Sequence, residues 1–415
     1  DTIKQSFQQI VYGINQPAGN RSYQSPFTNI SYYDSGYWHA LFDGALAGIP
    51  HGLDTYQCAN PETATVICEV FRTAGIPLGP LFRALSERAP EVAVVESDAS
   101  LIVGARIDWD CQGPAFGCGV IATAANLMPY ALNEEEIATR GIPGSVKVLL
   151  MPGCDVLTRS CYERIAAFQR CGGRIVADSN LVPGLRSDAE LPTVASAFAK
   201  TKDDHDDGSG KASLSDAAVH DRAFRRAAAL MKAAVLPAVR PYADSDNDGI
   251  LASARTSGDA DYVFAINDRR TTGEYVGPWR RVLEKGLPNS GEVSVAREAG
   301  AVYDLVRHVA VPFRIENGRT VIPVSFRTTD GKVFLLVSRP LAGLEVRVDQ
   351  THVRVVSPDR NVMVPIEIRI DGSKPFYAVV RDGVWERDFG KRIDGLEVVS
   401  LADGRTFGAD DIVIE

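Results

Sequence analysis

The chain has 415 residues, 45% of them hydrophobic and 23% charged, a composition typical of a globular protein with about two to four domains. Its net charge of −9 argues against general binding of nucleic acid or of membrane surfaces. No apolar run reaches the roughly 18 residues of a membrane span, so we expect neither nucleic acid nor a membrane as a partner.

The first 88 residues are predicted to contain short helices and one strand. SFQQIVYGIN near the N-terminus and YWHALFDGAL at 37–46 have helical patterns. HGLDTYQ at 51–57 is typical of a short strand that follows a turn. Pro61 suits the first turn of a helix that runs to about Arg72, and another helix is expected over Leu78–Arg88.

An open α/β domain is predicted over residues 89–240. The segment Glu91–Glu96 has the pattern of a strand, Ser97–Gly119 that of a glycine-rich loop, and Val120–Leu132 that of a helix. Val146–Met151 is a continuous apolar run, typical of a strand that is buried on both faces of a parallel sheet. An alanine-rich helix is expected over Ala217–Val235, after a polar linker or loop at 201–212.

The segment after Val146–Met151 completes a strand–helix–strand unit. Thr158 or Ser160 can cap a helix that has apolar residues at helical spacing. Gly172-Gly173 is expected to end this helix, because glycine takes left-handed backbone angles without cost. Arg174–Asp178 then begins a second buried strand.

From about residue 250 the pattern changes to short strands separated by turns. Turn signals such as Asn317-Gly318, Asp330-Gly331 and Asp371-Gly372 separate these segments. We therefore predict a β-sandwich at 241–340 and a second small β domain at 341–415. The strand candidates are ILASAR, YVFAIN, GEVSVA, AVYDLV, TVIPVSF, KVFLLV, LEVRVD, VRVVS, VPIEIRI and FYAVVR.

Several polar motifs match catalytic, metal or cofactor sites only in part. The seven cysteines include no CxxC and no zinc spacing, and the run Gly153-Cys154-Asp155 lacks the second glycine of a nucleophile elbow. The run at Asp244–Gly249 resembles half of an EF-hand loop, but Arg255 stands where the bidentate Glu is needed. Gly113, Gly117 and Gly119 match neither a Rossmann nor a P-loop pattern. We therefore predict no catalytic residue, no metal and no cofactor.

Three segments resemble the non-catalytic part of a glycoside hydrolase family 42-like β-galactosidase. YWHALFDGALAGIPHGLDTYQ at 37–57 is similar to the last helix and strand of that family's TIM barrel. PGCDVLTRSCYERIAAFQRCGG at 152–173 resembles the family's trimerisation domain, which has a flavodoxin-like, class I amidotransferase-like fold. AGAVYDLVRHVAVPF and the β run after it resemble glycosidase accessory sandwiches.

This resemblance implies a partial barrel segment at 1–88, an amidotransferase-like domain at 89–240 and sandwich material after it. It also implies a homo-oligomer, expected to be a trimer, in which the α/β domain serves assembly. The two carboxylates of the family's mechanism lie on earlier barrel strands, so the chain is expected not to be hydrolytic itself. Asp54, Tyr56 and Gln57 would lie at the end of the last barrel strand and could face a sugar.

Aromatic side chains add to the predicted carbohydrate contacts. Trp109, Phe116, Tyr275 and Trp279 are the rings best suited to stack on a sugar, because aromatic faces pack on apolar sugar faces. RRTTGEYVGPWRR at 269–281 is predicted to be a loop that contacts a ligand, another subunit or a neighbouring domain. The substrate-binding prediction therefore comprises Asp54, Tyr56, Gln57, Trp109 and Trp279.

Two other interpretations remain open at the level of the sequence. One is a sugar-binding or oligomerisation module without enzymatic activity. The other starts from residues 5–34, QSFQQIVYGINQPAGNRSYQSPFTNISYYD, which resemble a segment of anaerobic class III ribonucleoside-triphosphate reductase. That family's radical glycine and its cysteines cannot be placed on this sequence.

Overall fold

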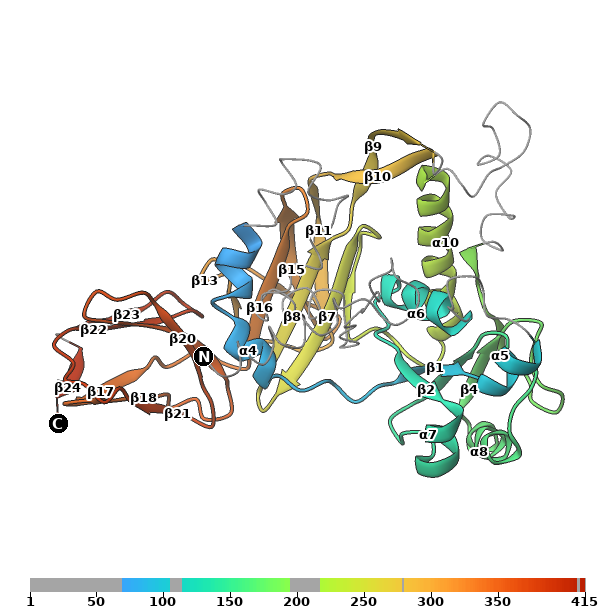
Figure 1. Cartoon of the computed structure of the whole chain (residues 1–415), viewed down its shortest axis with the longest axis horizontal. Coiled ribbons are helices and arrows are strands. Elements are labelled where there is room, and N and C mark those ends of the chain that lie inside the picture. The colour runs from blue at the N-terminus through green and yellow to red at the C-terminus, as the bar shows by residue number, and fades with distance from the viewer. Residues whose placement is uncertain (1–68, 105–113, 195–216, 278–279, 409–410, 415) are drawn as a thin grey trace, which may run out of the picture. The chain divides into compact units, whose positions relative to one another are not determined.

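The computed structural model describes residues 69–104, 114–194, 217–277, 280–408 and 411–414 (Figure 1). The predicted elements of residues 1–68, the linker at 201–212 and the reductase-like segment at 5–34 lie outside these ranges, so the structure does not test them. Within the described part of the chain, an α/β unit is followed by sheets that are antiparallel except for the pair β17 (Glu345–Asp349) and β24 (Ile412–Ile414), as the sequence predicts at the level of fold class.

A five-stranded parallel sheet forms the centre of the α/β unit. Its order is β2-β1-β3-β4-β5, and every pair of neighbouring strands is parallel. Side chains alternate between two cores, so that Val92 and Val94 lie in one and Ala93 and Val95 in the other. The apolar runs of the sequence follow from this, because both faces of the sheet are covered. The strands are β1 (Val92–Glu96), β2 (Tyr130–Asn133), β3 (Val148–Met151), β4 (Arg174–Ala177) and β5 (Ala189–Glu190).

Helices cover both faces of this sheet. The helices α6 (Pro114–Ala124) and α10 (Ala217–Val235) contribute to the core of one face through Ile121 and Met231. The helices α7 (Glu134–Arg140) and α8 (Arg159–Arg170) contribute to the other through Ile137 and Ile165. A short helix, α5 (Asp98–Gly104), follows β1.

Two antiparallel sheets share a core in the middle β unit, which comprises β6 to β16. One sheet has the order β14-β15-β11-β6 and the other β13-β12-β16-β8-β7. Val293 and Ile322 of the first sheet join Val263 and Leu336 of the second in one hydrophobic cluster. The strands are β6 (Ala243–Ser245), β7 (Ile250–Ser257), β8 (Ala260–Asn267), β11 (Asn289–Val295), β12 (Ala301–Asp304), β13 (Val309–Ala310), β14 (Arg314–Glu316), β15 (Arg319–Phe326) and β16 (Gly331–Val337).

A second pair of four-stranded sheets forms the C-terminal unit, which comprises β17 to β24. The orders are β21-β18-β17-β24 and β20-β19-β22-β23. Leu81 and Phe82 of the short helix α4 (Gly79–Ala84) belong to the same hydrophobic cluster as the interior of this unit. The strands are β17 (Glu345–Asp349), β18 (His352–Val356), β19 (Val364–Ile370), β20 (Phe376–Val380), β21 (Val384–Asp388), β22 (Leu396–Ser400), β23 (Thr406–Phe407) and β24 (Ile412–Ile414).

The strand–helix–strand prediction for Val146–Leu185 is confirmed. The two strands are β3 and β4, and α8 lies between them. Gly172, just past the end of α8, has a φ of +93°, as expected of a glycine that ends a helix. Thr158 is the N-cap residue, but its side chain makes no capping bond to the helix, because its hydroxyl lies 3.5 Å from Glu134 instead. The helix predicted over Ala217–Val235 is confirmed as α10.

Four predicted elements differ from the structure. The predicted helix Val120–Leu132 starts earlier, at Pro114, and ends at Ala124, because Asn126 and Met128 take positive φ values before β2. The predicted loop over Ser97–Gly119 contains α5 and the start of α6. The predicted loop at 269–281 lies within an antiparallel hairpin of β9 (Arg270–Gly277) and β10 (Arg280–Gly286). The helix predicted over Leu78–Arg88 is shorter, since α4 ends at Ala84.

Candidate functional site

The five predicted carbohydrate contacts cannot be placed. Asp54, Tyr56, Gln57, Trp109 and Trp279 all lie outside the described residues. The candidate sites therefore have to be built from other residues. Two places hold polar side chains in chemically notable arrangements: the carboxyl edge of the parallel sheet, and a buried carboxylate in the middle β unit.

The carboxyl edge of the parallel sheet is the first of these places. In open α/β sheets, ligands bind outside the carboxyl ends of the strands, where the strand order reverses. Here that point lies between β1 and β3. The hydroxyls of Ser97 and Ser100, just after β1, each lie 2.7 Å from the carbonyl oxygen of Val156, which follows β3. The amide of Val156 donates in return to Ser100 Oγ at 3.0 Å.

Glu134, which follows β2, contacts the residues after β1 and β3 at this edge of the sheet. Its side chain is buried, with the residue 4% exposed. Oε2 accepts from the amide of Ala99 in the first turn of α5 at 3.0 Å, and Oε1 accepts from the amide of Thr158 before α8 at 2.9 Å. Unpaired amides at helix N-termini attract anions. The protein's own carboxylate thus fills a position that an anionic ligand could otherwise occupy.

Cys154 lies at the same edge but is not arranged as a nucleophile. Its side chain is fully buried, and Sγ lies 3.5 Å from the carbonyl oxygen of Pro152. Burial raises the pKa of the Cys154 thiol well above its ordinary value, and the nearby charge of Asp178 raises it further. The Asp178 carboxylate instead accepts from the amide of Gly153 at 2.9 Å. A reactive cysteine needs a lowered pKa and access to solvent, so this arrangement favours a structural thiol.

We expect chemical labelling to separate these thiols. Burial raises the pKa of Cys118 and of Cys161 to about 12, whereas Cys171 is exposed. Iodoacetamide at pH 8 should therefore modify Cys171 within minutes and leave Cys154 unmodified until denaturant is added. Peptide mapping by mass spectrometry measures both, and rapid modification of Cys154 in the folded chain would contradict its assignment as structural.

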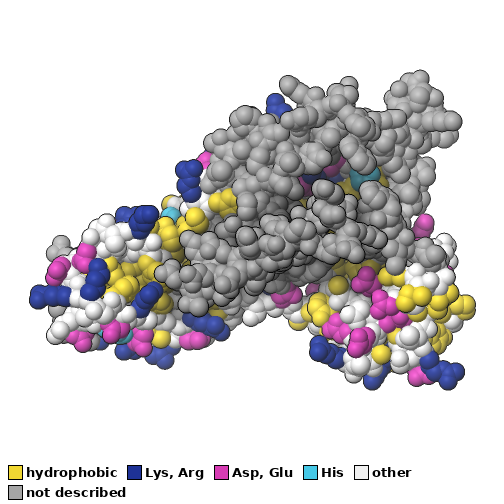
Figure 2. Space-filling model, viewed as in Figure 1, with side chains coloured by type: hydrophobic (Ala, Val, Ile, Leu, Met, Phe, Trp, Pro, Cys, Tyr) yellow, Lys and Arg dark blue, Asp and Glu magenta, His cyan; other side chains and the backbone are white. Residues whose placement is uncertain are grey.

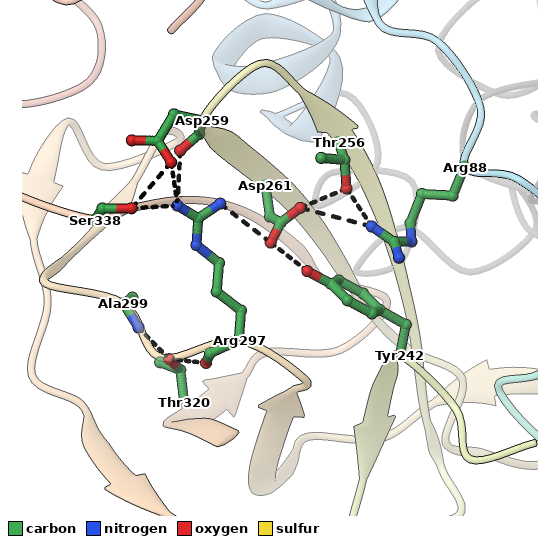
Figure 3. A network of polar contacts seen from close by, with 9 residues as sticks. All are labelled: Arg88, Tyr242, Thr256, Asp259, Asp261, Arg297, Ala299, Thr320 and Ser338. Atoms are coloured by element: carbon green, nitrogen blue, oxygen red, sulfur yellow. Dashed lines mark hydrogen bonds and ion pairs between the residues drawn. The ribbon is translucent and has the colours of Figure 1, made fainter. Parts of the chain in front are cut away.

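The second place is a network of polar contacts around Asp261 of β8 (Figure 3). The Asp261 side chain has no exposed surface. It accepts hydrogen bonds from the hydroxyls of Tyr242, at 2.6 Å, and of Thr256 on β7. Two guanidinium groups compensate its charge, with Arg297 Nη1 at 3.4 Å and Arg88 Nη1 at 3.9 Å. Thr256 is the cross-strand neighbour of Asp261, whereas Arg88, Tyr242 and Arg297 come from more distant parts of the chain.

Arg88 and Arg297 also contact residues other than Asp261. Arg88 lies over the ring of Tyr242, with Cζ 3.4 Å from the ring centroid. Arg297 Nη2 donates to the backbone oxygen of Asp259 at 2.7 Å and to the hydroxyl of Ser338 at 2.8 Å (Figure 3). Burial and the bond to Asp261 raise the pKa of Tyr242 to about 12, so its hydroxyl stays protonated at neutral pH. The network joins β7, β8 and the segment before β1, and gives Asp261 a structural role.

The acidic run Asp244–Gly249 is held by protein groups. Asp244 Oδ1 accepts from Asn126 Nδ2 at 3.2 Å and pairs with Lys232 of α10. Asp246 Oδ1 accepts from the amide of Glu292 at 2.7 Å. Among the residues that the structure describes, no group of three or more His, Cys, Asp or Glu side chains is placed to hold a metal ion. In the same ranges, no helix is long and apolar enough to span a membrane.

Sequence reasoning missed the residues that form both places. Asn133 followed by three glutamates is a helix N-cap signal, and Asn133 Oδ1 does accept from the amide of Glu136 at 2.8 Å. That signal could have placed α7, but not the burial of Glu134. Asp261 is the one charged residue of the mostly apolar strand ADYVFAIN, where a charged residue that must be buried predicts a compensating cation.

Comparisons with known proteins give only distant matches. No protein-family model and no curated protein matches the chain. Among solved structures, α-L-fucosidase isoenzyme 2 from Paenibacillus thiaminolyticus is 10% identical, with a TM-score of 0.42 over 67% of this chain and 52% of that one. A β-galactosidase from Bacillus circulans sp. alkalophilus is 14% identical, with a TM-score of 0.34 over 67% and 45%. A rhamnosidase from Novosphingobium sp. PP1Y is 12% identical, with a TM-score of 0.36 over 78% and 36%.

These three neighbours are glycoside hydrolases. The chain spans about half or less of the length of each. The TM-scores are too low for the similarity to carry an argument about activity, substrate or assembly. The proposals below therefore start from the sequence and from the contacts of the described residues.

Proposed function

We propose that the chain is the non-catalytic portion of a β-galactosidase-like glycoside hydrolase, in which the α/β unit serves assembly. The observation that carries this proposal is the carboxyl edge of the parallel sheet. There Ser97, Ser100 and Glu134 bond to the protein's own backbone. An amidotransferase-like unit that acts chemically would need a reactive nucleophile at this edge, and Cys154 is buried with a raised pKa.

The strand order supports the finer prediction for this unit. The order β2-β1-β3-β4-β5 with parallel strands is that of flavodoxin-like sheets. The paired sheets of the middle β unit, which share one core, and those of the C-terminal unit support the sandwich predictions for 241–340 and 341–415. In the described part of the C-terminal unit all strand pairs are antiparallel except β17 with β24, and its core cluster also includes Tyr262 of β8. The proposed boundary between the α/β and middle β units falls near residue 240, between the end of α10 and the start of β6.

The buried carboxylates of the β units also support a non-catalytic role. Asp304 accepts from the amides of Val306 and Arg307 at 3.0 and 3.1 Å, so it stabilises a turn. Asp359 accepts from the amide of Ala342 at 2.9 Å. A glycosidase needs one carboxyl as acid and another as nucleophile or base across a sugar-sized gap. These hydrogen bonds explain why each carboxylate is buried without giving it such a role.

Exposed apolar side chains on the α/β unit support assembly into a homo-oligomer. Ile102 and Val103 of α5 are 78% and 70% exposed, and Phe116 and Val120 of α6 are 53% and 41% exposed. Helix α6 carries no charged residue, and a helix that is apolar all round is normally buried. Figure 2 shows hydrophobic side chains at the surface of this unit. Exposed apolar surface of this kind marks protein–protein interaction sites. The family resemblance of the sequence implies that the oligomer is a trimer.

Light scattering on the purified chain tests the assembly. We expect a species well above the 44.8 kDa of one chain, and we expect Val103→Asp and Phe116→Asp each to shift it toward the monomer. Ile315→Asp is the matched control, because Ile315 of β14 is 44% exposed and lies on another unit. A wild-type monomer at all concentrations, or equal effects of the three substitutions, would contradict the assembly role of α5 and α6.

A sugar-binding module without enzymatic activity is the second candidate function. It is favoured by a partly exposed cluster of aromatic rings around an arginine in the C-terminal unit. The third interpretation, a reductase-like N-terminal segment at 5–34, lies outside the described residues and stays a prediction.

A further inference from the structure

The strands β20 and β21 meet at one edge of the C-terminal unit. Each is the edge strand of its own sheet, and a tight turn joins them. In that turn Asp382 and Gly383 have φ values of +55° and +82°, and the amide of Val384 donates to the carbonyl of Arg381 at 3.1 Å. An Asp-Gly pair with positive φ at both positions is typical of a two-residue hairpin turn. Beyond this turn the two strands separate into different sheets.

The inward-facing positions of these two strands carry large side chains. Phe376, Ala378 and Val380 lie on the same face of β20, and Ala378 and Val380 are buried. Along β21, Trp385 pairs with buried Val355 and Arg387 with buried Val353. Successive side chains of a strand point to opposite faces, so Phe376, Trp385 and Arg387 face the space between the sheets. Phe376 and Arg387 are nevertheless exposed and Trp385 is partly buried, so the three side chains lie at the edge of that space.

Four side chains form a compact group at this edge, which we call the Arg387 cluster: Phe376, Trp385, Arg387 and Phe389. Arg387 Cζ lies 4.7 Å from the ring centroid of Phe376 and 5.1 Å from that of Phe389. The rings of Phe376 and Trp385 are 6.0 Å apart at an angle of 40°. A guanidinium at these distances from aromatic faces is held by cation–π attraction. The rings therefore hold Arg387 in place.

Arg387 differs in its partners from Arg354 of the neighbouring strand and from Arg392. Arg354 pairs with Glu386 at 3.7 Å, and Arg392 pairs with Asp394 at 3.2 Å. Within the described part of the chain, no carboxylate lies within 4.0 Å of the Arg387 guanidinium, and the side chain is exposed. Its charge is thus uncompensated at the surface, while its position is fixed by the rings.

An inward-pointing charge on an edge strand can serve simply to prevent edge-to-edge pairing. That role needs the charge but not the exposed rings. Phe376 is 36% exposed, and Trp385 and Phe389 are only partly buried. Figure 2 shows hydrophobic side chains beside Lys and Arg side chains on the surface of this unit. The combination of ring surface and a fixed, unpaired guanidinium provides two complementary contacts for one ligand.

We propose that the Arg387 cluster binds an anionic sugar ring, one that carries a carboxylate or a sulfate group. The apolar face of the sugar would pack on the exposed parts of Phe376 and Trp385. The anionic group would accept hydrogen bonds from Arg387, whose planar fork of donors matches a carboxylate or a sulfate. This inference rests on the sugar-binding function given above as the second candidate, and it names the ligand class for it.

Titration of the intact chain with three oligosaccharides tests the proposal. The probes are a trigalacturonate, a sulfated galactan oligosaccharide and a neutral galactotriose, each followed by isothermal calorimetry at low salt. We expect at least one anionic probe to bind and the neutral probe to bind at least about tenfold more weakly, since the neutral sugar cannot form charge-assisted hydrogen bonds through an anionic group. The two anionic probes distinguish a uronic acid from a sulfated sugar.

Substitutions assign the binding to the cluster. Arg387→Gln and Phe376→Ala should each weaken binding about tenfold or more, whereas Arg354→Gln, an exposed arginine of the neighbouring strand, should leave it unchanged. Thermal unfolding checks that every variant is folded. Arg387→Ala serves as a second variant if the glutamine variant does not fold.

The proposal is overturned if no anionic probe binds up to millimolar concentration, or if folded Arg387→Gln binds like the wild type. Either result leaves the assembly proposal intact, because light scattering with the α5 and α6 variants decides that question independently.

Discussion

Asp261→Ala should lower the free energy of unfolding of the middle β unit by about 3 kcal/mol. The carboxylate is fully buried and compensates Arg297, which is itself only 15% exposed. Its removal leaves that guanidinium without its buried partner and leaves the hydroxyls of Tyr242 and Thr256 without their acceptor. Urea unfolding followed by tryptophan fluorescence, together with hydrogen exchange of β7 and β8, measures the change.

Asp394→Ala is the control for this substitution. It removes the same charge from a side chain that is 78% exposed and pairs only with a surface arginine. Exposed ion pairs contribute little, so we expect a change within about 0.5 kcal/mol. Similar losses from both substitutions would mean that the network around Asp261 does not hold the unit together.

Leu150→Ala should destabilise the α/β unit by about 2–5 kcal/mol. Leu150 is fully buried in β3, between Val94 of β1 and Val176 of β4, in the core that α6 and α10 cover. The substitution leaves a cavity at the centre of the parallel sheet, where covered faces on both sides restrict relaxation. Hydrogen exchange of β1, β3 and β4 reports on this unit separately from the β units.

Leu236→Ala makes the same chemical change just beyond α10, where the side chain is 43% exposed. We expect it to alter the stability of the unit by less than about 1 kcal/mol. A loss from Leu150→Ala no larger than that from Leu236→Ala would contradict the assignment of β3 to the middle of a sheet covered on both faces.

Periodicity predicted most of the described elements because their environments are regular. The apolar run Val146–Met151 predicts a doubly buried strand, because both of its faces pack against helices. The pattern of Ala217–Val235 predicts a helix, because one face of α10 packs against α6 and the sheet. The pattern of region 120–132 predicts one helix because most of its residues are apolar, and Val120–Ala124 are indeed helical. The positive φ values of Asn126 and Met128, which separate α6 from β2, have no signal in hydrophobic pattern.

The candidate sites were harder to predict because they depend on long-range contacts. Glu134 meets Thr158, and Arg88 meets Thr256 and Asp261, only once the fold is complete. Phe376 and Arg387 come together because two edge strands of different sheets follow one turn. The predicted contacts Asp54, Tyr56, Gln57, Trp109 and Trp279 stay predictions, since they lie outside the described residues.

The central claim, that this chain is not itself hydrolytic, is tested most directly by hydrolysis of a nitrophenyl β-galactoside. The assay should be run across the chromatographic peak of the purified chain, with a known β-galactosidase as positive control. We predict no release of nitrophenol above background in any fraction of the peak. Release that follows the concentration of the chain and is lost when one of its carboxylates is replaced would contradict the account.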